Sequence, residues 1–216
     1  MYHAHPHAQT RNRERRAQLA HEAARLMAES GISDFHQAKL KAAQRLGIHD
    51  DASLPANREI EAALREYQRL FLGPGQEHAL RIRRQAAVRA MEFFASFQPR
   101  LVGPVLEGTA DSSSVVQLHL HCEDSDAVAR FIHEHAIPAQ SRQRRLRLDR
   151  ARNLDTSAWL FSAEELPFEL IVLPLQALRQ PPLSPLDERP MPRASLAQLR
   201  QLIAQEHVAD HGQASR

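Results

Sequence analysis

The chain has 216 residues, 43% of them hydrophobic, so it can bury the core of one domain or of two small ones. The net charge is only +2, although all but two of the 28 basic side chains are arginines, a bias that suits phosphate binding and that a GC-rich genome also produces. A single cysteine excludes an internal disulfide, and the absence of an apolar run of about 18 residues or of a signal peptide predicts a cytoplasmic protein without a membrane span.

Four amphipathic helices are predicted in the first hundred residues. The first is centred on 19–27 and ends at Gly31, and the second begins after the N-cap Asp34 and ends at Gly47. The third runs from about 57 to 72, where Gly-Pro-Gly stops it, and the fourth covers about 79–97 and ends before Pro99. We expect the first three helices to form an N-terminal region, 1–75, that offers a surface to a protein partner, and the fourth to connect this region to the rest of the chain.

The period of the hydrophobic pattern changes from 3.6 to 2 after Pro99. Strands are predicted at 101–106 and 115–121, a helix at 124–135, and an antiparallel meander of strands at 143–149, 157–162 and 167–173. Six prolines between 174 and 192 indicate an extended linker, followed by a short helix at 196–203 and a disordered tail. The sequence therefore predicts an α+β protein with a small mixed-sheet domain at 76–174 and a Pro-rich linker, helix and flexible tail at 175–216.

The stretch LVGPVLEGTADSSSVVQLHL, at 101–120, contains a strand, a pair of glycines (Gly103 and Gly108), a polar loop ending at Ser114 and a second strand. In the same frame it resembles the motif of the minimal nucleotidyltransferases of the DNA polymerase β-like superfamily. That motif reads strand, Gly-Ser, a second Gly, a polar loop and Ser-Asp-hydrophobic-Asp. The later strand PFELIVLP also fits, so the resemblance covers about residues 78–174 and implies a sheet of nucleotidyltransferase-like topology.

The positions that hold magnesium in that family have largely lost their carboxylates. Val115 and Gln117 stand where the family has two aspartates, Pro104 replaces a phosphate-binding serine, and Glu169 matches the third carboxylate. Phosphoryl transfer needs a divalent metal held by hard oxygen ligands. The resemblance thus implies a pseudoenzyme, a catalytically inactive module that binds a nucleotide or a protein. The alternative is an active nucleotidyltransferase that uses Mg²⁺, with Glu169 as the catalytic candidate.

The implied nucleotide site combines residues of the motif with arginines of a later strand as phosphate partners: Gly103, Gly108, Ser114, Gln117, His119, Arg145 and Arg147. The segment RQRRLRLDRAR, at 142–152, carries six arginines, and Leu146 and Leu148 alternate with Arg145 and Arg147. Such a strand can bind nucleic acid, or it can be a solvated edge whose charge discourages aggregation.

Two further candidates have an ordinary structural interpretation beside the functional one. His119 and His121 share one strand face and are candidate metal ligands, but a closed site needs three or four ligands, and half-buried histidines give the same pattern. The first three helices are a second nucleic-acid candidate, as a helix-turn-helix, or a packing platform.

Overall fold

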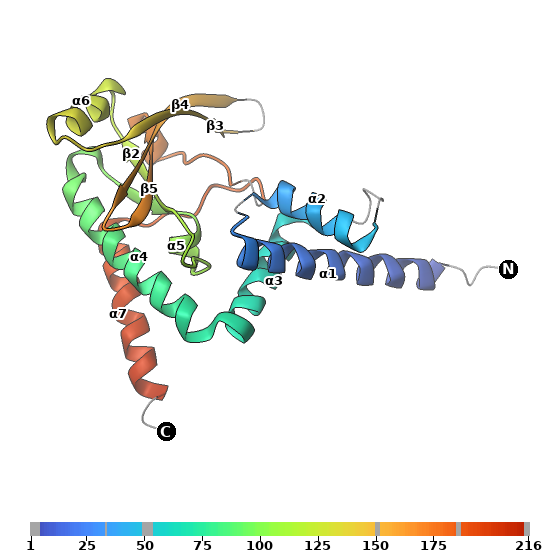
Figure 1. The fold of residues 1–216 in the computed structure, drawn as a ribbon. Helices are drawn as coiled ribbons and strands as arrows, with labels where there is room; N and C mark the ends of the chain where they lie inside the picture. The colour runs from blue at the N-terminus through green and yellow to red at the C-terminus, as the bar shows by residue number, and fades with distance from the viewer. Residues whose placement is uncertain (1–4, 33, 49–53, 150–151, 185–186, 214–216) are drawn as a thin grey trace. The chain divides into compact units, whose positions relative to one another are not determined.

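A computed structural model of the chain describes residues 5–32, 34–48, 54–149, 152–184 and 187–213. The chain divides into an N-terminal unit, residues 1–76 with 185–187, and a sheet unit, residues 77–184 with 188–216. The predicted α+β class is confirmed, with helices first and a mixed sheet after them (Figure 1). Within the described ranges, no helix combines the length and the apolar character that crossing a membrane requires.

The N-terminal unit is built on α1 (His5–Ser30), against which α2 (Phe35–Leu46) and α3 (Asn57–Tyr67) both pack. As predicted, Asp34 caps α2, because its Oδ1 accepts a hydrogen bond from the Gln37 N–H at 2.7 Å. The π-helical turn η2 (Gln68–Leu72) continues α3 to the predicted stop at Gly73. The helix α1 starts earlier than predicted, since the residues before position 19 include good helix formers such as arginine, glutamine and alanine.

The sheet unit contains the following elements: α4 (Gly73–Phe93, which begins before the boundary), η3 (Ala95–Phe97), β1 (Arg100–Val102), α5 (Pro104–Glu107), β2 (Val116–His121), α6 (Asp126–Glu134), β3 (Gln140–Arg147), β4 (Asn153–Ala163), β5 (Leu166–Leu173), η4 (Leu175–Leu178) and α7 (Leu196–Gln213). The strand order is β1-β2-β5-β4-β3. Only the central pair, β2 and β5, is parallel among these neighbours, and the others are antiparallel. The sheet is therefore mixed.

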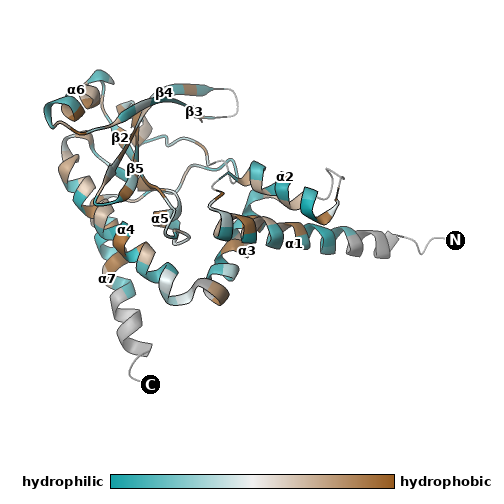
Figure 2. Cartoon of the chain, viewed as in Figure 1, coloured by the Kyte–Doolittle hydropathy of each residue, from teal (hydrophilic) through white to brown (hydrophobic). Residues whose placement is uncertain are grey.

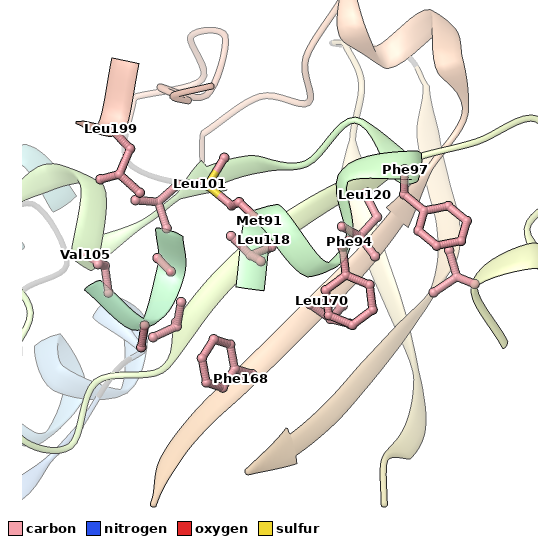
Figure 3. Close-up of a cluster of buried hydrophobic side chains, with 14 of the residues drawn as sticks. Met91, Phe94, Phe97, Leu101, Val105, Leu118, Leu120, Phe168, Leu170 and Leu199 are labelled. Carbon is pink, nitrogen blue, oxygen red and sulfur yellow. The ribbon is translucent and has the colours of Figure 1, made fainter. Parts of the chain in front are cut away.

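Strand pairing separates two faces of the sheet, because directly paired residues point to the same side. The helix face carries the large apolar side chains of β2 and β5, which pack with α4, α6 and α7 in one core. Figure 3 shows part of this core, with Leu118 and Leu170 near Met91 and Phe94. We call the opposite face the strap face, because the segment 188–195, the strap, lies over it through Arg193. This face carries the row Gln117, His119 and His121 on β2 beside Glu169 on β5. Hydropathy also changes across the sheet, since β3 is almost entirely hydrophilic and β5 largely hydrophobic (Figure 2).

The first predicted strand and the predicted linker differ from the structure. The strand predicted at 101–106 stops at Val102, because Gly103 adopts a φ of 70° and Pro104 starts the short helix α5. The predicted linker after residue 174 is packed rather than free: η4 buries Ala177 against the strap face, and the strap, residues 188–195, pairs with β1 through Ala194 and Leu101. Prolines interrupt regular structure there without preventing burial of the small apolar residues between them.

The C-terminal helix also departs from the prediction of a short helix and a disordered tail. Helix α7 continues to Gln213 rather than stopping near position 203. Leu199 anchors its first half in the core, and Glu206 forms an ion pair with the buried Arg84 of α4. These tertiary contacts supply a reason for order that the polar sequence of the tail does not contain.

Candidate functional site

The strap face has a buried carboxylate at its centre. Glu169 is 2% exposed and lies directly opposite Gln117 on the neighbouring parallel strand. The Gln117 Nε2 donates to Glu169 Oε2 at 2.8 Å, and Arg144 donates to Oε1 from Nε at 2.6 Å and from Nη2 at 2.5 Å. Both oxygens of the carboxylate are therefore engaged by side chains of this chain.

Arg144 was not among the predicted site residues. It comes from β3, two strands from β5, and its side chain is about half exposed, so it neutralises the buried Glu169 while it keeps contact with water itself. The predicted phosphate partners Arg145 and Arg147 have the opposite parity, which assigns them to the helix face. Arg147 also pairs with Glu188 of the strap. The alternation along β3 predicts that Arg144 lies on the opposite face from Arg145 and Arg147, but it does not predict which face also carries Glu169.

Of the predicted loop residues, Gly103 lies against this network. Its backbone has φ 70° and ψ −156°, and a Cβ on it would lie 2.3 Å from Gln117 Oε1. The Gln117 amide thus rests on the Gly103 Cα. Gly108 ends α5 beside Arg84, and the Ser114 hydroxyl donates to Asp111 at 2.9 Å. These last two residues are engaged within the loop rather than with Glu169.

Two buried arginines of α4 hold that loop, and neither was singled out from the sequence. Arg83 donates to the carbonyl oxygens of Ser114 at 2.7 Å and Ser112 at 2.5 Å. Arg84 donates to the carbonyl oxygen of Val105 at 3.0 Å. Burial lowers the pKa of Arg83, an effect that Asp111 opposes. Charge-assisted hydrogen bonds from these two arginines to backbone carbonyl oxygens therefore hold the loop in place.

The histidine row lies next to the carboxylate and is deeply buried. His119 and His121 are each 1% exposed, and the Nε2 atom of each has no partner among the described residues. The His121 Nδ1 lies 3.0 Å from the carbonyl oxygen of Gln98, so this nitrogen carries the proton when the ring is neutral. Above them, Arg193 of the strap donates to the carbonyl oxygen of Ala177 in η4 at 2.6 Å.

Both histidines are held in the neutral form. Burial, with smaller contributions from His121 and Arg193, lowers the pKa of His119 to about 3. Burial also lowers the pKa of His121 to about 4, opposed by its hydrogen bond to Gln98 and assisted by Arg100 and Arg193. In the described part of the chain, no group of three histidine, cysteine or acidic side chains surrounds a point where a metal ion would fit. Two nearby guanidinium groups further disfavour a cation at the predicted pair.

The residues at the motif positions do not fit a magnesium ion either. Val115 has no donor atom, Gln117 uses its amide N–H on Glu169, and Glu169 has both oxygens occupied. Mg²⁺ takes hard oxygen ligands in octahedral geometry and usually keeps one or two carboxylates. We therefore derive no reaction step through this metal.

The two nucleic-acid candidates gain little from the geometry. On β3, Arg144 and Arg147 are paired with glutamates, and Arg145 lies 3.8 Å from Asp155, so much of the positive charge is compensated. In the N-terminal unit, α1 and α2 lie side by side as an antiparallel hairpin (Figure 1), and α3 packs against α1 as well. Both the helix-turn-helix and the packing platform stay predictions for these three helices.

No protein-family model matches this chain, and no curated protein or solved structure matches it.

Proposed function

We propose that the sheet unit is a nucleotidyltransferase-like domain that does not transfer nucleotides and instead binds a phosphate-bearing ligand, a nucleotide in the first instance, without Mg²⁺. This proposal rests on the carboxylate of Glu169, which already has hydrogen-bond partners at both oxygens. Glu169 is the acidic residue that the resemblance retains, and Arg144 and Gln117 already satisfy both of its oxygens. A metal ion would have to displace an arginine and an amide to reach one carboxylate.

The topology supports the family assignment within this proposal. The resemblance requires the strand with the third carboxylate to lie beside the strand that carries positions 115 and 117, because the three side chains share metal ions in that family. Strand β5 is the parallel neighbour of β2, and Glu169 lies opposite Gln117. The helix α6 follows β2, and a helix after the second strand is a further part of the resemblance.

The charge of the strap face supports an anionic ligand. By strand parity, Arg100, Arg142 and Arg144 belong to this face, and Arg193 covers it from the strap. Glu169 is the single acidic residue of this face among the described strand residues. An excess of guanidinium groups attracts phosphate oxygens directly, and their planar geometry suits bidentate contacts.

Calorimetry with ATP and GTP, in EDTA and in Mg²⁺, tests the proposal together with an assay for pyrophosphate release. We expect binding that Mg²⁺ does not strengthen, and no pyrophosphate. Arg144→Gln is expected to weaken binding about tenfold, which corresponds to about 1.4 kcal/mol. Arg145→Gln is the matched control, because the same residue type on the same strand lies on the other face, and it is expected to leave affinity unchanged. Pyrophosphate release, or binding that depends on Mg²⁺, would overturn the inactive assignment.

A second experiment tests the resemblance itself. Replacing Val115→Asp and Gln117→Asp together restores the two lost carboxylates next to Glu169. We expect this double variant to bind Mn²⁺, measured by electron paramagnetic resonance, and the wild-type chain and a Val115→Asn, Gln117→Asn control to bind it at least tenfold more weakly. Equal Mn²⁺ binding by all three proteins would contradict the assignment of these positions.

A further inference from the structure

The two edges of the sheet differ in how far other segments of the chain pair with them. At the β1 edge, Leu101 exchanges two backbone hydrogen bonds of 2.9 Å with Ala194 of the strap. At the β3 edge, seven of the eight residues are exposed, and the Arg147 carbonyl oxygen accepts one bond, of 2.6 Å, from the Leu183 N–H. Within the described ranges, no strand pairs with the rest of that edge.

The backbone groups that β3 directs outward follow from the pairing register. The Leu148 N–H donates to the Arg152 carbonyl oxygen at 2.9 Å, so these two residues form a hydrogen-bonded pair. Such pairs alternate along an antiparallel ladder. Residues 141, 143, 145 and 147 therefore turn their N–H and C=O groups away from β4, which the bond from Leu183 to Arg147 confirms independently. Ser141, Gln143 and Arg145 present an open row of alternating donors and acceptors.

We propose that this edge accepts an extended, acidic segment of a partner protein as a sixth strand of the sheet. The backbone row supplies the hydrogen bonds of strand addition, and the side chains on either side of it select the partner. Arg142 on one face has no carboxylate partner among the described residues, and Arg145 on the other has only the distant Asp155. Acidic residues opposite these two arginines would form favourable cross-strand pairs.

A second copy of this chain fits the edge poorly. A two-fold pairing of β3 strands centred on Gln143 places Arg142 of one copy opposite Arg144 of the other, on the same face. Like charges directly opposite one another destabilise a strand pair. The partner is therefore a different, negatively charged segment. Arg142 belongs to both surfaces, but the two proposals are tested separately, because strand addition depends on the main chain of β3 and the nucleotide experiment changes the side chain of Arg144.

The probe is a fluorescein-labelled peptide of nine alternating glutamate and valine residues, with binding followed by anisotropy. We expect N-methylation of every second residue of the peptide to weaken binding at least tenfold, because it removes donors and leaves the charge unchanged. Gln143→Pro in the protein is expected to do the same. Since the Gln143 N–H points outward, proline there removes no bond of the β3–β4 ladder, and edge strands tolerate it. Gln143→Ala, which keeps the N–H, is the matched control.

Several results would overturn the proposal. The first is that the peptide does not bind. The second is that the methylated peptide binds as tightly as the unmodified one, or that Gln143→Pro binds the peptide as tightly as wild type, because charge attraction alone would then explain the interaction. A single-stranded oligonucleotide that displaces the peptide and binds Gln143→Pro as well as wild type would reassign the arginines to a nucleic acid. Nucleotide binding by Gln143→Pro is expected to match wild type, which separates failure of this proposal from failure of the nucleotide site.

Discussion

Arg144 and Glu169 form an ion pair across the intervening strand β4, one partner half exposed and the other buried. The pair is asymmetric, because loss of the arginine leaves a buried carboxylate, whereas loss of the carboxylate leaves a guanidinium that water can reach.

This asymmetry predicts unequal effects of the two single substitutions. Arg144→Met is expected to reduce the free energy of unfolding by about 1.5–3 kcal/mol, the usual range for a lost hydrogen bond to a charged group. Glu169→Gln keeps the shape of the side chain and is expected to cost about 1 kcal/mol or less. Urea denaturation measures both, with Arg145→Met as a control expected to change stability by about 0.5 kcal/mol or less. Equal losses for Arg144→Met and Arg145→Met would contradict the buried pair.

The contact between Gly103 and Gln117 predicts a strong local effect of Gly103→Ala. The backbone conformation of Gly103 is one that essentially only glycine adopts, so we expect a loss of about 1–3 kcal/mol from strain. The new methyl group also meets the Gln117 amide, which must leave Glu169. The side-chain amide signals of Gln117 in NMR spectra report this displacement. Gly75→Ala, where a Cβ meets no atom within 4 Å, is the control, and an unchanged Gln117 signal in Gly103→Ala would be inconsistent with the geometry.

The buried Arg83 predicts the order of the loop between α5 and β2. Arg83→Met removes the donors to Ser112 and Ser114, so we expect faster amide hydrogen exchange in residues 109–115 and a loss of stability of about 2–3 kcal/mol. Arg81→Met is the matched control, since Arg81 is an exposed residue of the same helix. The prediction fails if exchange in the loop is the same in both variants.

The histidine row predicts the response of stability to acid. The folded-state pKa values of His119 and His121 both lie below the ordinary value of 6.5. Below that pH the two histidines are protonated in the unfolded chain but stay neutral in the folded chain. Stability is therefore fully present above about pH 6.5 and falls as the pH drops toward 4, with a slope of up to roughly 2.7 kcal/mol per pH unit for two groups. Denaturation at pH 7, 6 and 5 measures this slope. Replacement of both histidines by glutamine is expected to flatten it, whereas replacement of the exposed His133 is not; an unchanged slope would exclude the buried pair as its source.

Local sequence patterns anticipated most of the elements of this fold. The cap at Asp34, the stop at Gly73 and the strand that ends at His121 were predicted from capping rules and periodicity. These features depend on a few neighbouring residues. The packed strap and the long helix α7 were missed, because their order comes from contacts with residues distant in sequence, such as Leu101 and Arg84.

The row of residues on β2 could be predicted from the sequence, but the arginine that neutralises Glu169 could not. Period-2 alternation placed Gln117, His119 and His121 on one face before any strand pairing was known. The choice between Arg144 and Arg145 depends on the register of β3 with β4, which a single sequence does not specify. The burial of Arg83 and Arg84 could not be predicted, because the hydrophobic pattern of a helix treats every arginine as exposed.

The backbone bridge between Leu101 and Ala194 joins the first strand of the sheet to the strap, which follows the last strand in the sequence. During synthesis, the ribosome releases β1 and β2 long before it releases the residue that closes their outer edge. The β1 edge of the nascent sheet therefore stays unpaired until the strap follows, and an unpaired strand edge is a site at which a partly folded chain aggregates.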